Sequence, residues 1–307
     1  MLETDTPFHP GEIAVQTRVG VAEMAAKFGG KAIRDHLIDQ HRDFYPLLPM
    51  VFLGAADDEG RPWASLLAGP PGFAHAPDAG ALRLDARPAA GDALEAALTP
   101  GRKVGVLGLE WQTRRRNRLA GRVAAADAGG VAIAVEQAFG NCPKYIQTRT
   151  PGGPTTGAAA ASRRPAFSAD DLSLIRAADT LMIATVRPGD SASDGADVSH
   201  RGGAPGFVEV EADGALLWAD YPGNRFFNTL GNIEATGRAG LLFVDWATGA
   251  GLQATGTAEI VWTGPSVDRL RGAERAVRFR ATEVRTVPGL LPEAWRLLEV
   301  SPYLERL

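Results

Sequence analysis

The chain has 307 residues, of which 45% are hydrophobic and 22% are charged, and its formal net charge at pH 7 is -4. This length suits two domains, and the acidic balance excludes a broad electrostatic attraction for nucleic acid. No run of about 18 apolar residues is present, and the acidic opening residues do not resemble a secretion signal. We therefore expect a cytoplasmic protein that has neither a membrane nor a nucleic-acid partner.

The cysteine and histidine content argues against a metal site. The single cysteine, Cys142, cannot form an internal disulfide, and the five histidines do not cluster with it at the spacing of zinc ligands. His36 and His41 lie five residues apart, which does not place them on one face of a helix. Cys142 is also more typical of a small buried residue than of a nucleophile. We expect no bound metal.

The first half of the chain begins with a helical pattern and continues with strands. Residues 1–20 are polar and interrupted by Pro and Gly, and residues 21–41 carry apolar residues at helical spacing, with a break at Gly29 and Gly30. A short amphipathic helix is expected at 92–98. Apolar runs bounded by turn residues predict strands at 50–56, 62–68, 81–86 and 104–110.

Residues 150–166 are rich in Gly, Pro, Thr, Ala and Ser, a composition typical of a linker. The pattern of the first half then restarts, with a helix capped by Ser168 and a strand at 180–186. We therefore predict an N-terminal domain at 1–149, this linker, and a C-terminal domain at 167–307.

The two halves resemble each other in sequence. Residues 63–73 and 197–207 align in one register, with Ser65 matching Ser199 and Gly69 matching Gly203, and other matches recur at the same offset. Such a pattern indicates an internal duplication. Strands joined by short turns, with one small helix in each copy, predict a mainly β protein with short helices. Each half is expected to be a small antiparallel β-barrel, and a helix at 292–298 is expected to cover one barrel.

The copies differ in polarity at two places, which predicts where a ligand binds. His200 and Arg201 replace two leucines of the first copy, and the segment 220–225, which contains Asp220 and Tyr221, is more polar than its counterpart. Pairing of adjacent strands would bring these segments together at the start of a helix expected at 224–234. A helix N-terminus favours an anion, whereas the alternative is a helix cap with a surface ion pair. The candidate phosphate ligands are Ser199, Arg201, Asn224 and Arg225.

A run of arginines at 114–118 places Arg114, Arg116 and Arg118 on one face of a strand. A ligand between two barrels is commonly shared, so Arg116 and Asn117 are expected to reach the site from the first half. The alternative is a solvated basic hairpin. A nucleic-acid site is thinly supported, because no aromatic residues are interleaved with these arginines.

His200 is the candidate for proton chemistry, because histidine titrates near neutral pH. The alternative, that its imidazole only packs or hydrogen-bonds, is equally open. The sequence offers no other acid–base pair, so the catalytic residues stay unassigned.

The segments at 197–208, 220–225 and 240–245 resemble the pyridoxamine 5'-phosphate oxidase-like, FMN-binding split-barrel proteins. The first half is similar to the amino-terminal part of tandem members. The segments that carry this similarity are Phe8–Gly11, Pro62–Ser65, Arg114–Asn117 and Phe139–Gln147. The resemblance implies two tandem FMN-binding split β-barrels packed as a pseudo-dimer, with FMN between them and its phosphate on the four candidate ligands.

This resemblance also implies an FMN-dependent oxidoreductase with an unassigned small-molecule substrate and an electron donor such as NAD(P)H. The segment Arg225–Thr229 departs from the Ser-Arg-Lys pattern of the true oxidases, which argues against a vitamin B6 substrate. The rival function is a non-catalytic flavin-binding module, and relatives of this fold also bind heme or a deazaflavin. The apolar first copy predicts one flavin per chain. A homodimer is left open, because the tandem already supplies two barrels.

Overall fold

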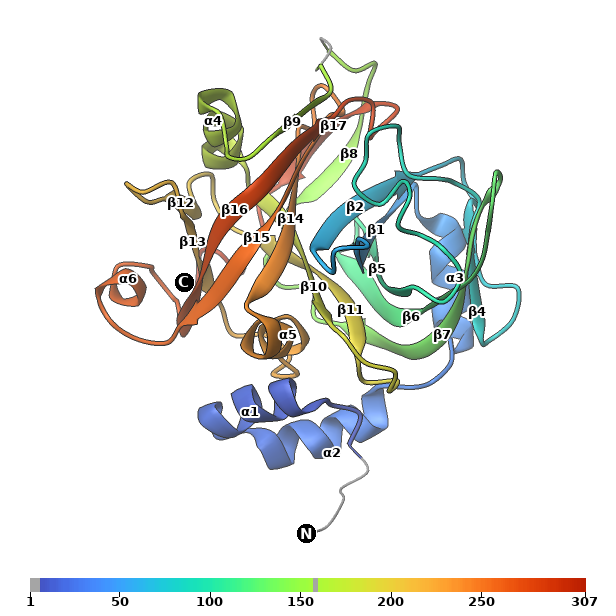
Figure 1. The fold of residues 1–307 in the computed structure, drawn as a ribbon, viewed down its shortest axis with the longest axis horizontal. Coiled ribbons are helices and arrows are strands. Elements are labelled where there is room, and N and C mark those ends of the chain that lie inside the picture. The colour runs from blue at the N-terminus through green and yellow to red at the C-terminus, as the bar shows by residue number, and fades with distance from the viewer. Residues whose placement is uncertain (1–5, 157–159) are drawn as a thin grey trace.

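Two antiparallel sheets form the framework of the protein, as shown by a computed structural model that describes residues 6–156 and 160–307 (Figure 1). The first sheet has seven strands in the order β2-β1-β5-β6-β7-β4-β3 and curls around the core of the first half. Its strands are β1 (Met50–Ala56), β2 (Pro62–Ala68), β3 (Ala74–His75), β4 (Ala81–Leu84), β5 (Lys103–Glu110), β6 (Arg115–Asp127) and β7 (Gly130–Asn141).

The second sheet has the order β11-β10-β14-β15-β16-β13-β12, which is the order of the first sheet strand for strand, with β9 added beside β16. Its strands are β9 (Ser162–Arg164), β10 (Thr180–Arg187), β11 (Gly195–Gly202), β12 (Val208–Val210), β13 (Leu216–Asp220), β14 (Arg238–Val244), β15 (Gly251–Val261) and β16 (Arg275–Val287). The predicted fold class, mainly β with short helices in two tandem barrels, is confirmed.

The helices lie at the ends and edges of the sheets. They are α1 (Pro10–Val19), α2 (Ala22–Ala32), α3 (Asp39–Phe44), the 3-10 turn η1 (Tyr45–Leu47), α4 (Ala169–Ala177), α5 (Asn228–Thr236) and α6 (Pro265–Asp268). In the described part of the chain, none of the helices has the length and apolar character needed to cross a membrane.

Two expectations for the first 41 residues are wrong. Helix α1 forms in the segment expected to be irregular, because His9 and Glu12 make a reciprocal capping box and Pro10 occupies the first helical position. Helix α2 runs through Gly29 and Gly30 instead of breaking there. A side chain at Gly29 would collide with the ring of Phe8, so this glycine lets the chain cross closely within an intact helix.

Two other predicted helices are also absent. Residues 92–98 form successive turns, because the Asp92 carboxylate accepts hydrogen bonds from its neighbour Leu94 N and from Ser65 Oγ and competes with helix formation. Most of 292–298 is strand β17 (Ala294–Glu299), which pairs with β8 (Thr148–Gly153). Strand pairing with a segment that begins at the predicted linker overrides the local helical pattern.

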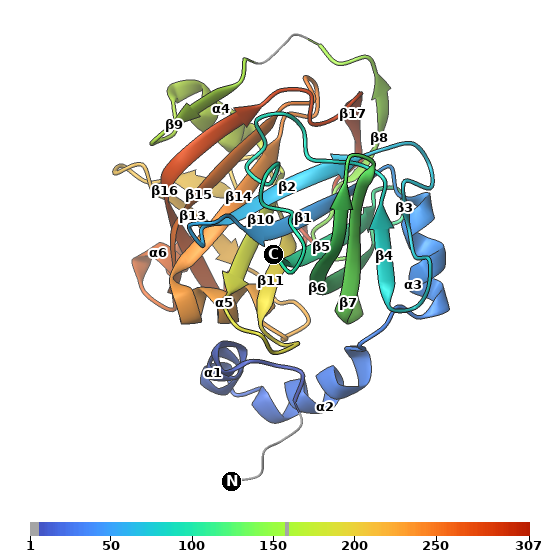
Figure 2. The same cartoon turned by 45° about the vertical axis from the view of Figure 1, so that its right-hand side comes forward.

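The two halves pack against each other through glycines. A Cβ on Gly105 of β5 would lie 2.8 Å from the carbonyl oxygen of Ala196, and a Cβ on Gly240 of β14 would lie 2.3 Å from that of Pro62. The two contacts are equivalent in the two halves. Gly105 and Gly240 lie on strands with the same place in the strand order, β5 and β14, and Ala196 and Pro62 lie directly before the aligned residues 197 and 63. An apolar cluster that contains Phe52, Leu107, Met182 and Leu242 joins the two halves. Figure 2 shows the two sheets lying side by side.

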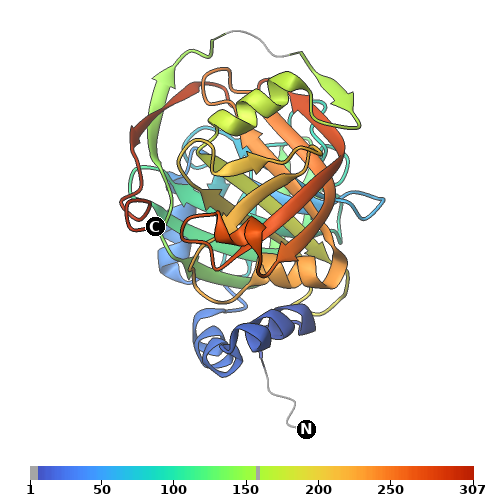
Figure 3. The ribbon, with the colours of Figure 1, turned by 90° about the vertical axis from the view of Figure 1, so that its left-hand side faces the viewer.

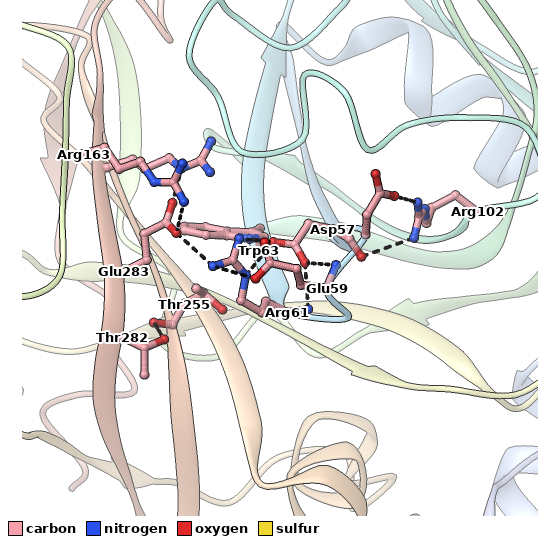
Figure 4. A network of polar contacts seen from close by, with 11 residues as sticks. Asp57, Glu59, Arg61, Trp63, Arg102, Arg163, Thr255, Thr282 and Glu283 are labelled. Atoms are coloured by element: carbon pink, nitrogen blue, oxygen red, sulfur yellow. Dashed lines mark hydrogen bonds and ion pairs between the residues drawn. The ribbon is translucent and has the colours of Figure 1, made fainter.

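A polar network joins the halves on another side of this contact. The Arg61 Nη1 atom donates to Glu283 Oε2 at 2.9 Å, and the Arg61 Nε atom donates to Asp57 Oδ2 at 2.8 Å. Trp63 Nε1 donates to the same Asp57 oxygen, and Figure 4 shows the indole beside the Arg61 guanidinium. The turn between β1 and β2 is thereby fixed to β16 of the other half.

Helix α1 belongs to the first half in sequence but packs on α5 of the second half, below the second sheet in Figure 3. A Cβ on Gly11 would lie 2.3 Å from the Gly231 carbonyl oxygen, so the two helices cross in close contact. The crossing buries Glu12, whose carboxylate accepts hydrogen bonds from His9 N at 2.8 Å and from Asn228 Nδ2. Burial raises the pKa of Glu12 from 4.5 to about 8.

The raised pKa of Glu12 predicts a pH-dependent stability. Between about pH 4.5 and pH 8 the folded state binds the extra proton, so the free energy of unfolding falls as the pH rises through this range. Burial lowers the pKa of His9 to about 4, and its opposing contribution ends near pH 6.5. In Glu12→Gln the free energy of unfolding should no longer fall between pH 6.5 and 8. The difference in this free energy between variant and wild type should therefore change by about 2 kcal/mol over this range.

Urea unfolding of both proteins at pH 6.5 and pH 8 measures this difference. The exposed Glu23 of α2, changed to Gln, is the matched control and should show the pH dependence of the wild type. If the free energy of unfolding of Glu12→Gln differed from that of the wild type by the same amount at both pH values, this would contradict a buried, protonated carboxyl group at Glu12.

Candidate functional site

The seam pocket lies between the two halves, against β11 and the start of α5. Its cavity volume is about 100 Å³. The first half contributes Arg116, Arg118, Asn141, Cys142, Lys144 and Tyr145. The second half contributes, among others, Ser199, His200, Arg201, Asp220, Tyr221, Asn224, Arg225, Asn228 and Thr229. Eight of the nine residues predicted to bind a cofactor therefore line one pocket, and Asn117 does not.

The two polar segments of the second half meet for a reason other than the one expected. Strand β11 pairs with β10, and β13 pairs with β12 and β16, so the segments do not lie on adjacent strands. They stand toward opposite ends of the strand order, and the curling of the sheet brings them to one pocket.

The helix at the pocket begins at Asn228 instead of the expected residue 224. Arg225 and Phe227 have left-handed backbone angles, φ 66° and 61°, which interrupt a regular helix before that point. Phe227 is the N-cap and supplies no side-chain hydrogen bond to the first turn. The free N–H groups and the positive dipole end of α5 are therefore available at the pocket wall, where an anion would be stabilised.

Hydroxyl groups and one arginine surround this helix end. Thr229 Oγ1 lies 2.7 Å from Asp197 Oδ2 and 3.0 Å from Ser199 Oγ. Arg201 donates from Nη1 to the His200 carbonyl at 3.1 Å, and its Nη2 atom lies 3.9 Å from Asp220 Oδ1. Its buried Nε atom has no hydrogen-bond partner. Burial lowers the pKa of Arg201, which means that holding this cation at the pocket destabilises the protein when no anion is bound.

The other two predicted phosphate ligands are engaged in hydrogen bonds to the protein. Arg225 donates to both carboxylate oxygens of Glu274, at 2.8 and 2.6 Å. Asn224 donates to Asn141 Oδ1 at 3.3 Å and accepts from Phe226 N at 3.1 Å. Both residues line the pocket, but their contacts hold the loop before α5 in shape. Their direct contact with a ligand stays a prediction.

The arginine strand divides between the pocket and the core. Arg116 and Arg118 line the seam pocket, because alternate residues of a strand share a face. Arg118 pairs with Asp197, whereas Arg116 has no ion pair within the described residues and its buried Nε atom lacks a partner. Burial lowers the pKa of Arg116 to about 10. Asn117 points the other way, accepting from Tyr45 OH at 2.7 Å and donating to the Phe139 carbonyl at 3.1 Å.

His200 is buried, and its Nε2 atom has no hydrogen-bond partner. Burial, together with the charges of Arg116 and Arg201, holds the pKa of His200 well below its ordinary value. The imidazole is therefore neutral at pH 7. This state suits a hydrogen bond to a bound group better than storage of a proton, which favours the second of the two interpretations made from the sequence.

A loop of the first half covers one side of the pocket, and the predicted site did not include it. Tyr145 has a left-handed φ of 66°, its hydroxyl donates to the Pro222 carbonyl at 3.3 Å, and its ring lies 5.0 Å from that of Tyr221. A Cβ on Gly202 would lie 2.0 Å from the Tyr145 carbonyl oxygen, so only glycine permits this approach. The sequence signal for this loop was the segment 139–149, which contains several polar residues but did not indicate where the loop would lie.

The corresponding place in the other half is filled. Gly251 of β15 pairs with Val244 of β14, just as Arg116 of β6 pairs with Leu109 of β5. A glycine therefore occupies the position at which the seam pocket has an arginine without an ion pair. The Leu290 side chain lies 2.6 Å from the position of a Gly251 Cβ, within an apolar cluster that includes Leu66. The two sheets of shared strand order thus form a polar pocket on one side and a packed core on the other.

Comparison with known families agrees with this geometry. Residues 171–300 match the family model described as pyridoxamine 5'-phosphate oxidase. The second half of the chain is therefore similar to the pyridoxamine 5'-phosphate oxidase family. The resemblance found in the sequence to the FMN-binding split-barrel proteins of this family is therefore confirmed, and the oxidase family's match includes β11, the loop before α5 and α5 itself.

Solved structures that resemble part of the chain were found, whereas no curated protein sequence matches it. HupZ from Group A Streptococcus is 20% identical, with 38% of this chain and 89% of that chain covered and a TM-score of 0.30. A Clostridium acetobutylicum protein related to general stress protein 26 is 16% identical, covering 42% and 92%, with a TM-score of 0.28. A pyridoxamine 5'-phosphate oxidase-related, FMN-binding protein from Nostoc punctiforme is 13% identical, covering 43% and 91%, with a TM-score of 0.26.

Proposed function

We propose that the protein binds one FMN in the seam pocket and acts as an FMN-dependent oxidoreductase. The observation that carries the proposal is the uncapped N-terminus of α5, which lines the pocket together with Arg201, Ser199 and Thr229. Free helix N–H groups, hydroxyls and a guanidinium form a donor set that suits a phosphate monoester. The match to the oxidase family supports a flavin as the group that carries this phosphate.

The unpartnered polar atoms of the pocket provide a test of fit. His200 Nε2, Arg201 Nε and Arg116 Nε are buried without hydrogen-bond partners, and each such atom costs free energy unless a ligand satisfies it. The lining contains five cationic side chains and one carboxylate, that of Asp220. A bound anion with further polar edges would satisfy these groups.

FMN, when bound, supplies hydride and single-electron transfer. The protein's own residues bind and orient it. Arg201, Ser199, Thr229 and the α5 N-terminus hold the phosphate. Neutral His200 offers a hydrogen bond without carrying a positive charge, and the Tyr145–Tyr221 pair covers one side of the pocket.

The organisation of the chain fits the same proposal. We infer an internal duplication, with domains at 1–149 and 167–307 joined by 150–166, from the shared strand order and the matched glycine contacts. Helix α1 would then be an arm of the first domain that packs on the second. The cytoplasmic location and a further homodimer stay predictions of the sequence.

Reduction of the bound flavin by a nicotinamide tests the oxidoreductase. The FMN-loaded protein is mixed anaerobically with NADPH or NADH, and loss of the visible flavin absorption is followed, with dithionite as the control for a reducible flavin. We expect one nicotinamide to reduce the bound flavin faster than it reduces free FMN. Rates no faster than those of free FMN, with this pair and with common electron acceptors, would instead support the non-catalytic flavin-binding module.

A further inference from the structure

A second pocket, here called the arginine pocket, lies beside the seam pocket between α3 and the start of β6. It encloses about 480 Å³. Arg116, Asn141 and Cys142 line both pockets, so these residues form the wall between them. The function proposed above makes no use of this space.

The wall of the arginine pocket is cationic. Arg114, Arg115 and Arg116 line it consecutively, and its lining includes neither an aspartate nor a glutamate. Arg115 pairs with Glu110 at 2.8 Å, and Arg114 reaches Glu299 at 3.3 Å, both outside the pocket wall. Arg116 has no carboxylate partner among the described residues. An uncompensated guanidinium of this kind is stabilised when a ligand supplies the negative charge.

A buried histidine strengthens this assignment. His41 is 8% exposed, lines the arginine pocket, and has a buried Nδ1 atom without a hydrogen-bond partner. The ring of Phe44 and the ring of Pro143 add apolar surface, and the Arg115 guanidinium lies 5.5 Å from the Phe44 ring centre. One side of the space therefore suits charge and hydrogen bonds, and the other suits a flat apolar group.

The backbone around the two pockets is strained in the same way. The described non-glycine residues with positive φ are Arg114, Tyr145, Arg225 and Phe227. Arg114 lines the arginine pocket, and the other three line the seam pocket. Left-handed non-glycine residues cluster at binding sites, because only a functional requirement maintains their cost of about 1–3 kcal/mol each. Both pockets share this mark.

We propose that the arginine pocket binds an aromatic organic anion, with its carboxylate or phosphate at Arg116 and its ring against Phe44 and Pro143. This site lies beside the flavin site and shares Arg116 with its wall, but binding of the anion does not require bound flavin. Asn117 also lines the arginine pocket, and both ends of its side chain are hydrogen-bonded within the first half.

Benzoate and phenyl phosphate are suitable probes, with benzyl alcohol as the neutral analogue. Each is titrated by calorimetry into the protein saturated with FMN, so that the seam pocket does not take the probe. We expect both anions to bind at least tenfold more tightly than benzyl alcohol. Equal binding of the alcohol, or no binding of either anion, would overturn the proposal.

Gln40→Trp places a large side chain in the arginine pocket from an exposed position of α3, so folding should be preserved. This variant should lose anion binding while retaining FMN. Arg116→Gln should weaken anion binding at least tenfold, and Arg122→Gln, on the same strand but paired with Glu136, should bind as the wild type does. Unchanged anion binding in Gln40→Trp would overturn the assignment. A protein that refuses FMN but binds the anions in a Gln40-sensitive way would contradict only the proposed flavin function.

Discussion

Replacing Arg201 with glutamine is expected to weaken FMN binding about a hundredfold. The Arg201 guanidinium is a cation at the seam pocket whose nearest carboxylate oxygen, on Asp220, is 3.9 Å away, and its buried Nε atom is unpartnered. A charge-assisted hydrogen bond from such a group contributes about 1.5–3 kcal/mol, and each 1.4 kcal/mol changes a dissociation constant tenfold. Quenching of FMN fluorescence on titration with flavin-free protein measures the constant.

Arg225→Gln is the matched control for this variant. Both arginines line the seam pocket, but the charge of Arg225 is balanced by two hydrogen bonds to Glu274. We expect Arg225→Gln to weaken FMN binding by less than about fivefold. A larger loss in Arg225→Gln than in Arg201→Gln would contradict the assignment of Arg201 as the main cationic ligand of the phosphate.

Gly240→Val is expected to destabilise the protein by about 3 kcal/mol or more. A Cβ at this position would lie 2.3 Å from the Pro62 carbonyl oxygen and 2.6 Å from the Trp63 Cα, so backbone of the first half occupies the space. The clash cannot be relieved by turning a side chain. The sheets must separate, which also opens the network that joins Arg61 to Glu283. Denaturant unfolding of the flavin-free protein measures the loss.

Gly140→Val provides the comparison on another strand. Gly140 is exposed on β7, and a Cβ there would meet nothing within 4 Å. Its stability should stay within about 0.5 kcal/mol of the wild type. Equal unfolding midpoints for Gly240→Val and Gly140→Val would mean that the two halves do not pack as closely as the structure shows.

The sequence predicted the architecture because the two halves share residues that the fold requires. Gly69 and Gly203 are an example, since a Cβ on either would collide with the ring four residues later, Phe73 or Phe207. Local requirements of this kind are visible in the sequence as glycine and phenylalanine residues at the same spacing in both halves. A similar β fold in the two halves could therefore be anticipated, whereas their common strand order is seen only in the structure.

The candidate site was predicted in part, because only some of its features are local. The contrast between Leu66 and His200 marked the polar copy. The partners that decide which groups are free lie far away in the chain: Glu274 takes the charge of Arg225, and Asp197 takes that of Arg118. The late start of α5 depends on two left-handed residues, Arg225 and Phe227, which residue preferences do not reveal. The Tyr145 loop required the packing of both halves.

The number of flavins bound per chain tests the central claim most directly. Flavin-free protein is titrated with FMN, the excess is removed, and the flavin released by heat is identified and compared with the protein concentration. The filled counterpart at Gly251 and Leu290 leads us to expect one FMN per chain, with Arg201→Gln reducing it toward none. Two FMN per chain, or one that Arg201→Gln leaves in place, would contradict a single asymmetric flavin site.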